Sequence, residues 1–213
     1  CLNMEYLSSD KVSTGDKNIV LGEYNDKNVS DLLISIDALF VYSLNQYQNN
    51  LQTNNIFDYS KLLVNEYVAS EKGSIDKKAL SYVLAESLNL LNNINKDTSY
   101  NDIMNNIHFK NLSLYITKQD FNYATLDSNG NVLEETKVNW QSISDGTNFV
   151  CHEIIRYTLE YIKNMVKFSS YEEGVYNTYL TKSNSNLEES IQAYQNAILG
   201  ECEKVDIKEY IKK

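Results

Sequence analysis

Apolar residues recur every three or four positions along most of the chain, which is the spacing of helices that bury one face. This pattern predicts helices over residues 30–51, 57–72, 75–94, 145–168 and 171–180. The residues SNSN at 183–186 then predict a loop, and a last helix follows a capping box at Ser185–Glu188. The stretch after Asp145 carries two adjacent apolar stripes, so we expect a helix buried on two sides at the centre of the fold.

The pattern changes between Phe109 and Trp140, where β-branched and aromatic residues partly alternate with polar ones. The segments LSLYITK, FNYATLD and VLEETKVNW predict two or three strands, and DSNGN at 127–131 predicts a turn between the last two. The sequence therefore predicts a predominantly helical α+β fold. It consists of a helical bundle or hairpins with a small antiparallel β-hairpin or three-stranded sheet inserted near residues 109–140.

Residues 1–27 mix Ser, Thr, Gly, Asp, Lys and Asn with few apolar residues. This composition predicts a flexible N-terminal tether with room for one short strand near Ile19–Leu21. Residues 28–213 are long enough to form a single, mainly helical domain.

The net charge of −10 and the single arginine, Arg156, argue against nucleic acid as a partner, because phosphate binding needs clustered cations. No apolar run reaches the roughly 18 residues that a membrane-spanning helix needs. The longest candidate, residues 32–44, is interrupted by Asp37 and two serines.

Cys151, His152 and Glu153 have the side chains of a nucleophile, a base and an orienting acid. Consecutive helical residues point about 100° apart, however, and cannot form one hydrogen-bonded line. The helical spacing places Cys151 on the buried stripe and His152 on a polar side with Arg156 and Glu160. We therefore predict no catalytic residues here.

His108 is the only other histidine, and its surroundings offer no metal-ligand spacing, so no metal or cofactor is predicted. Cys151 and Cys202 could pair in an oxidising compartment, or each could be a small buried hydrophobe. The 17 tyrosines suit half-buried packing positions, and a tyrosine-rich binding face is the alternative.

Cys1 followed by a polar stretch resembles the mature form of a bacterial lipoprotein, whose signal peptide has been removed. The resemblance implies lipid attachment at Cys1, residues 2–27 as a spacer, and a domain held outside the membrane at the cell envelope. The function expected from this is a non-enzymatic surface module that binds a protein or another partner, or joins an envelope assembly, with the membrane contacted only through lipid on Cys1.

Two alternatives stay open. The first is an intracellular helical adaptor or structural protein without lipid. The second is a hydrolase that uses Cys1 as an N-terminal nucleophile, although such enzymes need a larger sheet than the two or three strands predicted here.

Overall fold

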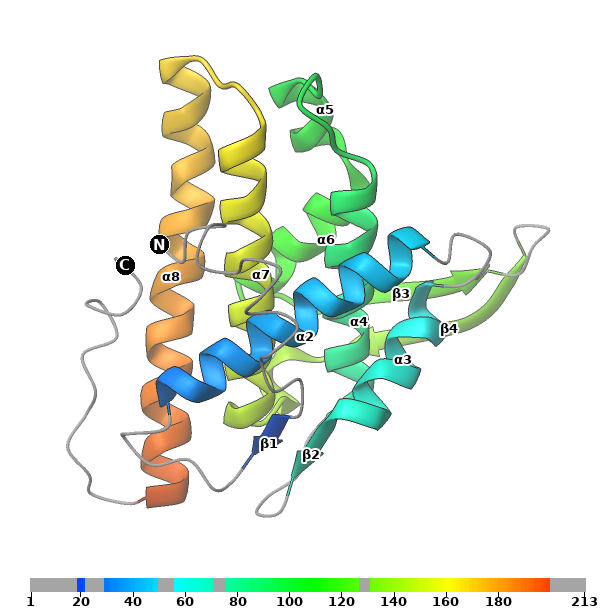
Figure 1. Ribbon diagram of the computed structural model, residues 1–213, viewed down its shortest axis with the longest axis vertical. Helices are drawn as coiled ribbons and strands as arrows, with labels where there is room; N and C mark the ends of the chain where they lie inside the picture. Colours follow the sequence, from blue (N-terminus) through cyan, green and yellow to red (C-terminus); the bar gives the residue numbers. More distant parts are fainter. Residues whose placement is uncertain (1–18, 22–28, 50–55, 71–75, 127–130, 200–213) are drawn as a thin grey trace.

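The computed structural model describes residues 19–21, 29–49, 56–70, 76–126 and 131–199. These residues are predominantly helical, as the sequence predicts (Figure 1). The elements in chain order are β1 (Ile19–Leu21), α2 (Val29–Asn49), α3 (Ile56–Tyr67), β2 (Val68–Ser70), α4 (Lys77–Asn92), α5 (Tyr100–Asn105), α6 (Ile107–Ile116), β3 (Phe121–Leu126), β4 (Val132–Val138), the 3₁₀ turn η2 (Trp140–Ser142), α7 (Asp145–Met165) and α8 (Ser170–Leu199).

Helix α7 is the centre of the fold. It packs antiparallel to α8 and also contacts α4 and α2, which lies obliquely across it (Figure 1). Every residue from Thr147 to Glu160 is buried, which confirms the prediction of a central helix. The helix begins at the cap Ser144, whose hydroxyl accepts a hydrogen bond from the backbone N–H of Thr147 at 3.3 Å.

Helix α8 is continuous, so the predicted break and loop at Ser183–Asn186 are wrong. Ser183 and Asn186 are buried. The Nδ2 amide of Asn186 donates a 2.6 Å hydrogen bond to the backbone oxygen of Ile116, at the end of α6. The contact with α6 gives the buried Asn186 amide a hydrogen-bond partner while its backbone stays helical. The preference of the local sequence for a loop therefore does not decide the structure.

Strands β1 and β2 pair in parallel, with Ile19 opposite Val68. Both residues are buried in the core. Strand β1 matches the short strand that the sequence predicts inside residues 1–27, whereas β2 occupies the region where the sequence predicts the end of a helix. The structure thus brings part of the predicted tether segment onto the domain.

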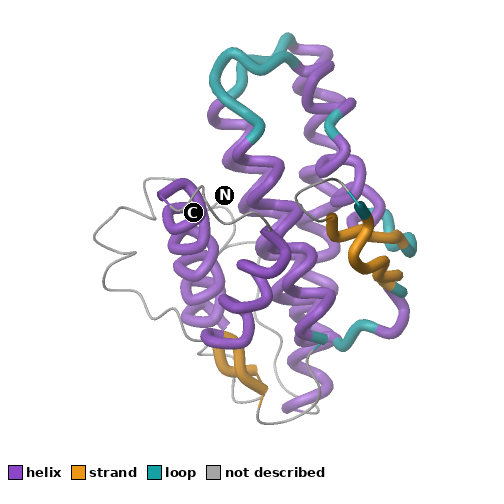
Figure 2. Tube along the Cα trace, turned by 90° about the vertical axis from the view of Figure 1, so that its right-hand side faces the viewer, coloured by secondary structure: helices purple, strands orange, loops and turns teal. Residues whose placement is uncertain are grey.

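Strands β3 and β4 pair antiparallel, from Phe121 opposite Val138 to Leu126 opposite Val132. They lie on the other side of the molecule from β1 and β2 (Figure 2). The prediction of a third strand at LSLYITK is wrong, because most of this segment belongs to α6. Within that helix, Phe109, Leu112 and Ile116 are buried at helical spacing.

Among the helices of the described segments, none is both long enough and apolar enough to cross a membrane.

Candidate functional site

The residues that the sequence singles out are not brought into one catalytic arrangement in the described segments. Cys1 and Cys202 lie outside the described residues. Cys151 is a fully buried free thiol, and burial raises its pKa to about 12, which makes it a poor nucleophile. The ring of His152 lies against Tyr115, with centroids 5.1 Å apart, while Glu153 bonds to Arg156.

The polar side that the sequence predicts for His152, Arg156 and Glu160 is itself covered, because all three residues are buried. Arg156 Nε donates to Glu153 Oε2 at 2.9 Å, and its Nη2 donates to Glu153 Oε1. Asp37, fully buried on α2, belongs to the same cluster, since burial and then the Glu153 carboxylate raise its pKa well above the usual value. Solvent does not reach this cluster, so its role is structural.

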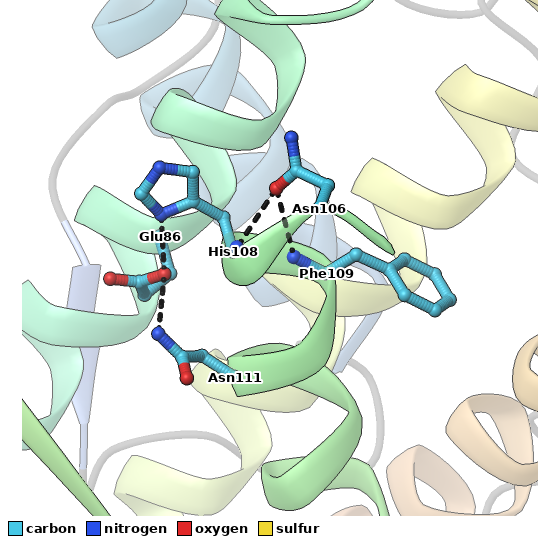
Figure 3. Close-up of polar contacts among 5 residues, drawn as sticks. All are labelled: Glu86, Asn106, His108, Phe109 and Asn111. Carbon is cyan, nitrogen blue, oxygen red and sulfur yellow. Dashed lines mark hydrogen bonds and ion pairs between the residues drawn. The ribbon is translucent and has the colours of Figure 1, made fainter. Parts of the chain in front are cut away.

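His108 is held at the start of α6. Its Nδ1 lies 2.8 Å from Oε2 of Glu86 on α4, and the same oxygen accepts a 3.2 Å hydrogen bond from Asn111 Nδ2 (Figure 3). The Asn106 side chain accepts hydrogen bonds from the backbone N–H groups of His108 and Phe109, at 2.8 and 3.3 Å. The cap and the Glu86 contact together fix the first turn of the helix.

This anchoring positions Phe109, whose ring points away from His108 (Figure 3). No group of three or more potential metal-binding side chains occurs around His108 or elsewhere in the described part of the chain. The first turn of α6 thus holds the Phe109 ring in place.

Phe109 is part of a cluster that we call the aromatic end. It comprises Tyr100 of α5, Phe109 of α6, Phe168 in the α7–α8 turn, and Tyr171, Tyr176 and Tyr179 of α8. Successive rings lie close to one another. The centroid distances are 6.1 Å for Tyr100–Phe168, 4.9 Å for Phe168–Tyr176, 6.4 Å for Tyr176–Phe109 and 5.2 Å for Phe109–Tyr179. Helix α5 and the α7–α8 turn lie at the same end of the molecule, at the top of Figure 1.

The aromatic end has a buried base and an exposed upper layer. Phe109 and Tyr176 are buried, Tyr100 is half-buried, and Tyr171 is 79% exposed. Partial desolvation raises the pKa of Tyr100, as do the nearby hydroxyls of Tyr171 and Tyr179. These side chains therefore face one another across α5 and α8.

The α7–α8 turn is fixed by a reciprocal capping box. Ser169 N–H donates to Glu172 Oε1 at 2.9 Å, and Glu172 N–H donates to Ser169 Oγ at 3.2 Å. Tyr171 lies between these two residues in the sequence, so its backbone is held in place. The aromatic end is a preformed surface.

The sequence raises a tyrosine-rich binding face as an alternative but does not show which tyrosines form it. Helix α5 was not predicted, although Ser99 accepts a 3.1 Å hydrogen bond from the backbone N–H of Asp102, and this cap pattern is readable in the sequence. Recognising that cap would have located Tyr100 at a helix start.

Comparisons with known proteins find no match, since no family model, curated protein or solved structure resembles the chain closely enough.

Proposed function

We propose that the protein is a non-enzymatic binding module that engages a protein partner through the aromatic end. The observation that carries the proposal is Tyr171, a large aromatic side chain that is 79% exposed and lies close enough to Tyr100 of the aromatic end to add to the rise in its pKa that desolvation causes. Tyrosine is enriched among the residues that dominate protein–protein binding, because it buries a large apolar body and keeps a polar tip.

The surroundings of Tyr171 support this role. Its backbone is fixed by the Ser169–Glu172 capping box, so little backbone freedom remains to be lost on binding. The net charge of −10 favours a partner with complementary positive charge.

In this proposal the small antiparallel hairpin near residues 109–140 is an insertion that takes no part in binding. Its strands β3 and β4 pair with each other, and β3 contacts the end of α6 away from Phe109. Helices α5, α6 and α8 and the α7–α8 turn supply the aromatic end.

The experiment places a photo-cross-linking amino acid at Tyr171 in cells that produce the protein. The matched control is Leu62 on α3, which is 68% exposed and lies outside the aromatic end. We expect an adduct of one defined mass from position 171 and none from position 62. Adducts at both positions, or at neither, contradict the proposal.

With the partner identified, the purified proteins give a quantitative test. Tyr171→Ala should weaken binding by about tenfold or more, as truncation of an interface anchor does, and Leu62→Ala should leave affinity unchanged. Both side chains are exposed, so neither change should alter the unfolding free energy by more than about 0.5 kcal/mol.

Attachment to a membrane through lipid on Cys1 stays a separate prediction, because Cys1 lies outside the described residues. Intact mass of the protein isolated from its own cells tests it, and a diacylglyceryl adduct on Cys1 is the expected result. An unmodified thiol at Cys1 would favour the intracellular adaptor instead.

A further inference from the structure

A second, smaller site lies at the opposite end of α6 from Phe109. The end of α6, the turn η2, α7 and α8 enclose a polar pocket with a volume of about 90 Å³. Lys118, Trp140, His152 and Glu189 are among the residues that line it. Because water occupies about 30 Å³ in the liquid, the pocket has room for about three waters or one molecule of about four heavy atoms.

Lys118 is held in this pocket by an unusual backbone conformation. Its φ is 60°, the left-handed region that favours glycine. The backbone N–H of Lys118 donates to the Tyr115 oxygen, and that of Gln119 donates to the Leu114 oxygen at 2.8 Å, which together form a Schellman motif at the end of α6. A lysine therefore occupies a position where glycine would be less strained.

The Lys118 ammonium has two neighbours. It lies 5.1 Å from the ring centroid of Trp140, and 2.9 Å from Oε2 of Glu189. The Glu189 side chain is 68% exposed, so its carboxylate can move into solvent at little cost. The ion pair shows that the space beside Lys118 accepts a carboxylate.

Two buried nitrogens of the pocket residues have no hydrogen-bond partner among the described residues. They are Trp140 Nε1 and His152 Nδ1. The indole N–H can only donate, so it requires an acceptor. The His152 side chain is 1% exposed, and burial, followed by the charge of Lys118, lowers its pKa to about 3, so the ring is neutral at physiological pH. A buried polar group without a partner is costly, and a ligand can supply what is missing.

We propose that this pocket binds a small organic carboxylate, whose oxygens replace Glu189 on Lys118 and accept the Trp140 indole hydrogen. One cation and one donor-only N–H match a monoanion with two acceptor oxygens. Asp145 and Glu189 also line the pocket and disfavour a dianion such as phosphate. The volume fits a ligand of acetate size. The site is separate from the aromatic end and does not depend on the role proposed for it.

Trp140 is the only tryptophan, so its indole N–H gives a single resonance that reports on the pocket. The full chain is titrated with sodium acetate at constant ionic strength, and with acetamide and phosphate as the neutral and the more highly charged probe. We expect a saturable shift with acetate alone. No saturation by acetate, or an equal response to acetamide or phosphate, overturns the proposal.

Two variants sharpen the test. Glu189→Gln removes the competing carboxylate and should tighten acetate binding by up to about fivefold, as expected for loss of a weak surface ion pair, whereas Glu188→Gln should not change it. Lys118→Gly keeps the left-handed backbone and should fold, yet lose acetate binding. Retained binding in folded Lys118→Gly, or weaker binding in Glu189→Gln, also overturns the proposal.

Discussion

Arg156 donates hydrogen bonds to both carboxylate oxygens of Glu153, one turn earlier on α7, and neither side chain is exposed to solvent. Asp37 of α2 lies within interaction range of both. The only arginine of the chain thus neutralises acidic groups in the core, where α2 crosses α7. A buried cluster of this kind stabilises the contact between two helices only while each charged side chain keeps its partner.

Arg156→Met should therefore destabilise the protein strongly. The substitution leaves the buried Glu153 without a counter-charge, which costs about 3–5 kcal/mol in comparable cases. Equilibrium denaturation in urea measures the change in unfolding free energy. Lys163→Met, a change of a half-buried cation near the end of the same helix, is the control and should cost less than about 1 kcal/mol. A loss below about 1 kcal/mol in Arg156→Met would contradict the assigned role.

The raised pKa of Asp37 predicts a specific pH dependence. Burial raises this pKa first, then the charge of Glu153 and a hydrogen bond with it, while Arg156 opposes the shift. The folded state therefore holds the Asp37 proton above pH 3.8, where the unfolded chain releases it. Because the folded state binds more protons, the contribution of Asp37 to the unfolding free energy falls as pH rises from 3.8 through the raised pKa.

Asp37→Asn tests this dependence, because asparagine resembles the protonated acid but does not titrate. The difference in unfolding free energy between the variant and the wild type should shift in favour of the variant as pH rises from about 5 to about 8. Urea denaturation at several pH values measures it. Glu153, Arg156 and Tyr157 interact with Asp37 and remain in both proteins, so the comparison isolates the carboxyl. A difference that does not change with pH would disprove the prediction.

The cap at Asn106 should control the start of α6. Asn106→Ala removes the acceptor for the backbone N–H groups of His108 and Phe109 and should cost about 1 kcal/mol. Hydrogen exchange should accelerate at these two amides. Asn106→Ser retains a capping oxygen and should recover most of the loss. Equal destabilisation by both substitutions would show that the cap is not the cause.

The spacing of apolar residues in the sequence predicts α2, α4 and α7, because a helix that buries one face has apolar residues every three or four positions. Two segments were misread where local preference and packing disagree. Residues 112–118 are rich in β-branched and aromatic side chains, yet Phe109, Leu112 and Ile116 have helical spacing once the helix start at Asn106 is included. In α8 the serines and asparagines at 183–186 favour a loop locally, but Asn186 finds its partner on α6.

The sites were less predictable than the fold, for a physical reason. Periodicity shows that a helix has a second, polar side, but not whether another helix covers it. The sequence therefore places His152 and Arg156 on a polar side of the helix but does not show that this side is covered, as it is from Thr147 to Glu160. The sequence likewise does not predict the exposure of Tyr171 or the neighbours of Lys118. The first depends on the conformation of the α7–α8 turn, and the second on the backbone conformation at the end of α6.

Cys151 should report the opening of α7. The thiol is fully buried and its pKa is raised to about 12 by burial, so a thiol reagent reaches it only when the helix detaches. With Cys1→Ser and Cys202→Ser, Cys151 is the only cysteine left. Labelling of this protein near pH 8 should be slower than in urea by a factor of roughly 10³ or more, since global unfolding of a domain costs about 5 kcal/mol or more. Adding Arg156→Met should accelerate labelling by the same factor as it raises the unfolding equilibrium constant, about tenfold for each 1.4 kcal/mol of lost stability, because both experiments follow the same opening. Labelling as fast in buffer as in urea would show that α7 is not the enclosed centre of the fold.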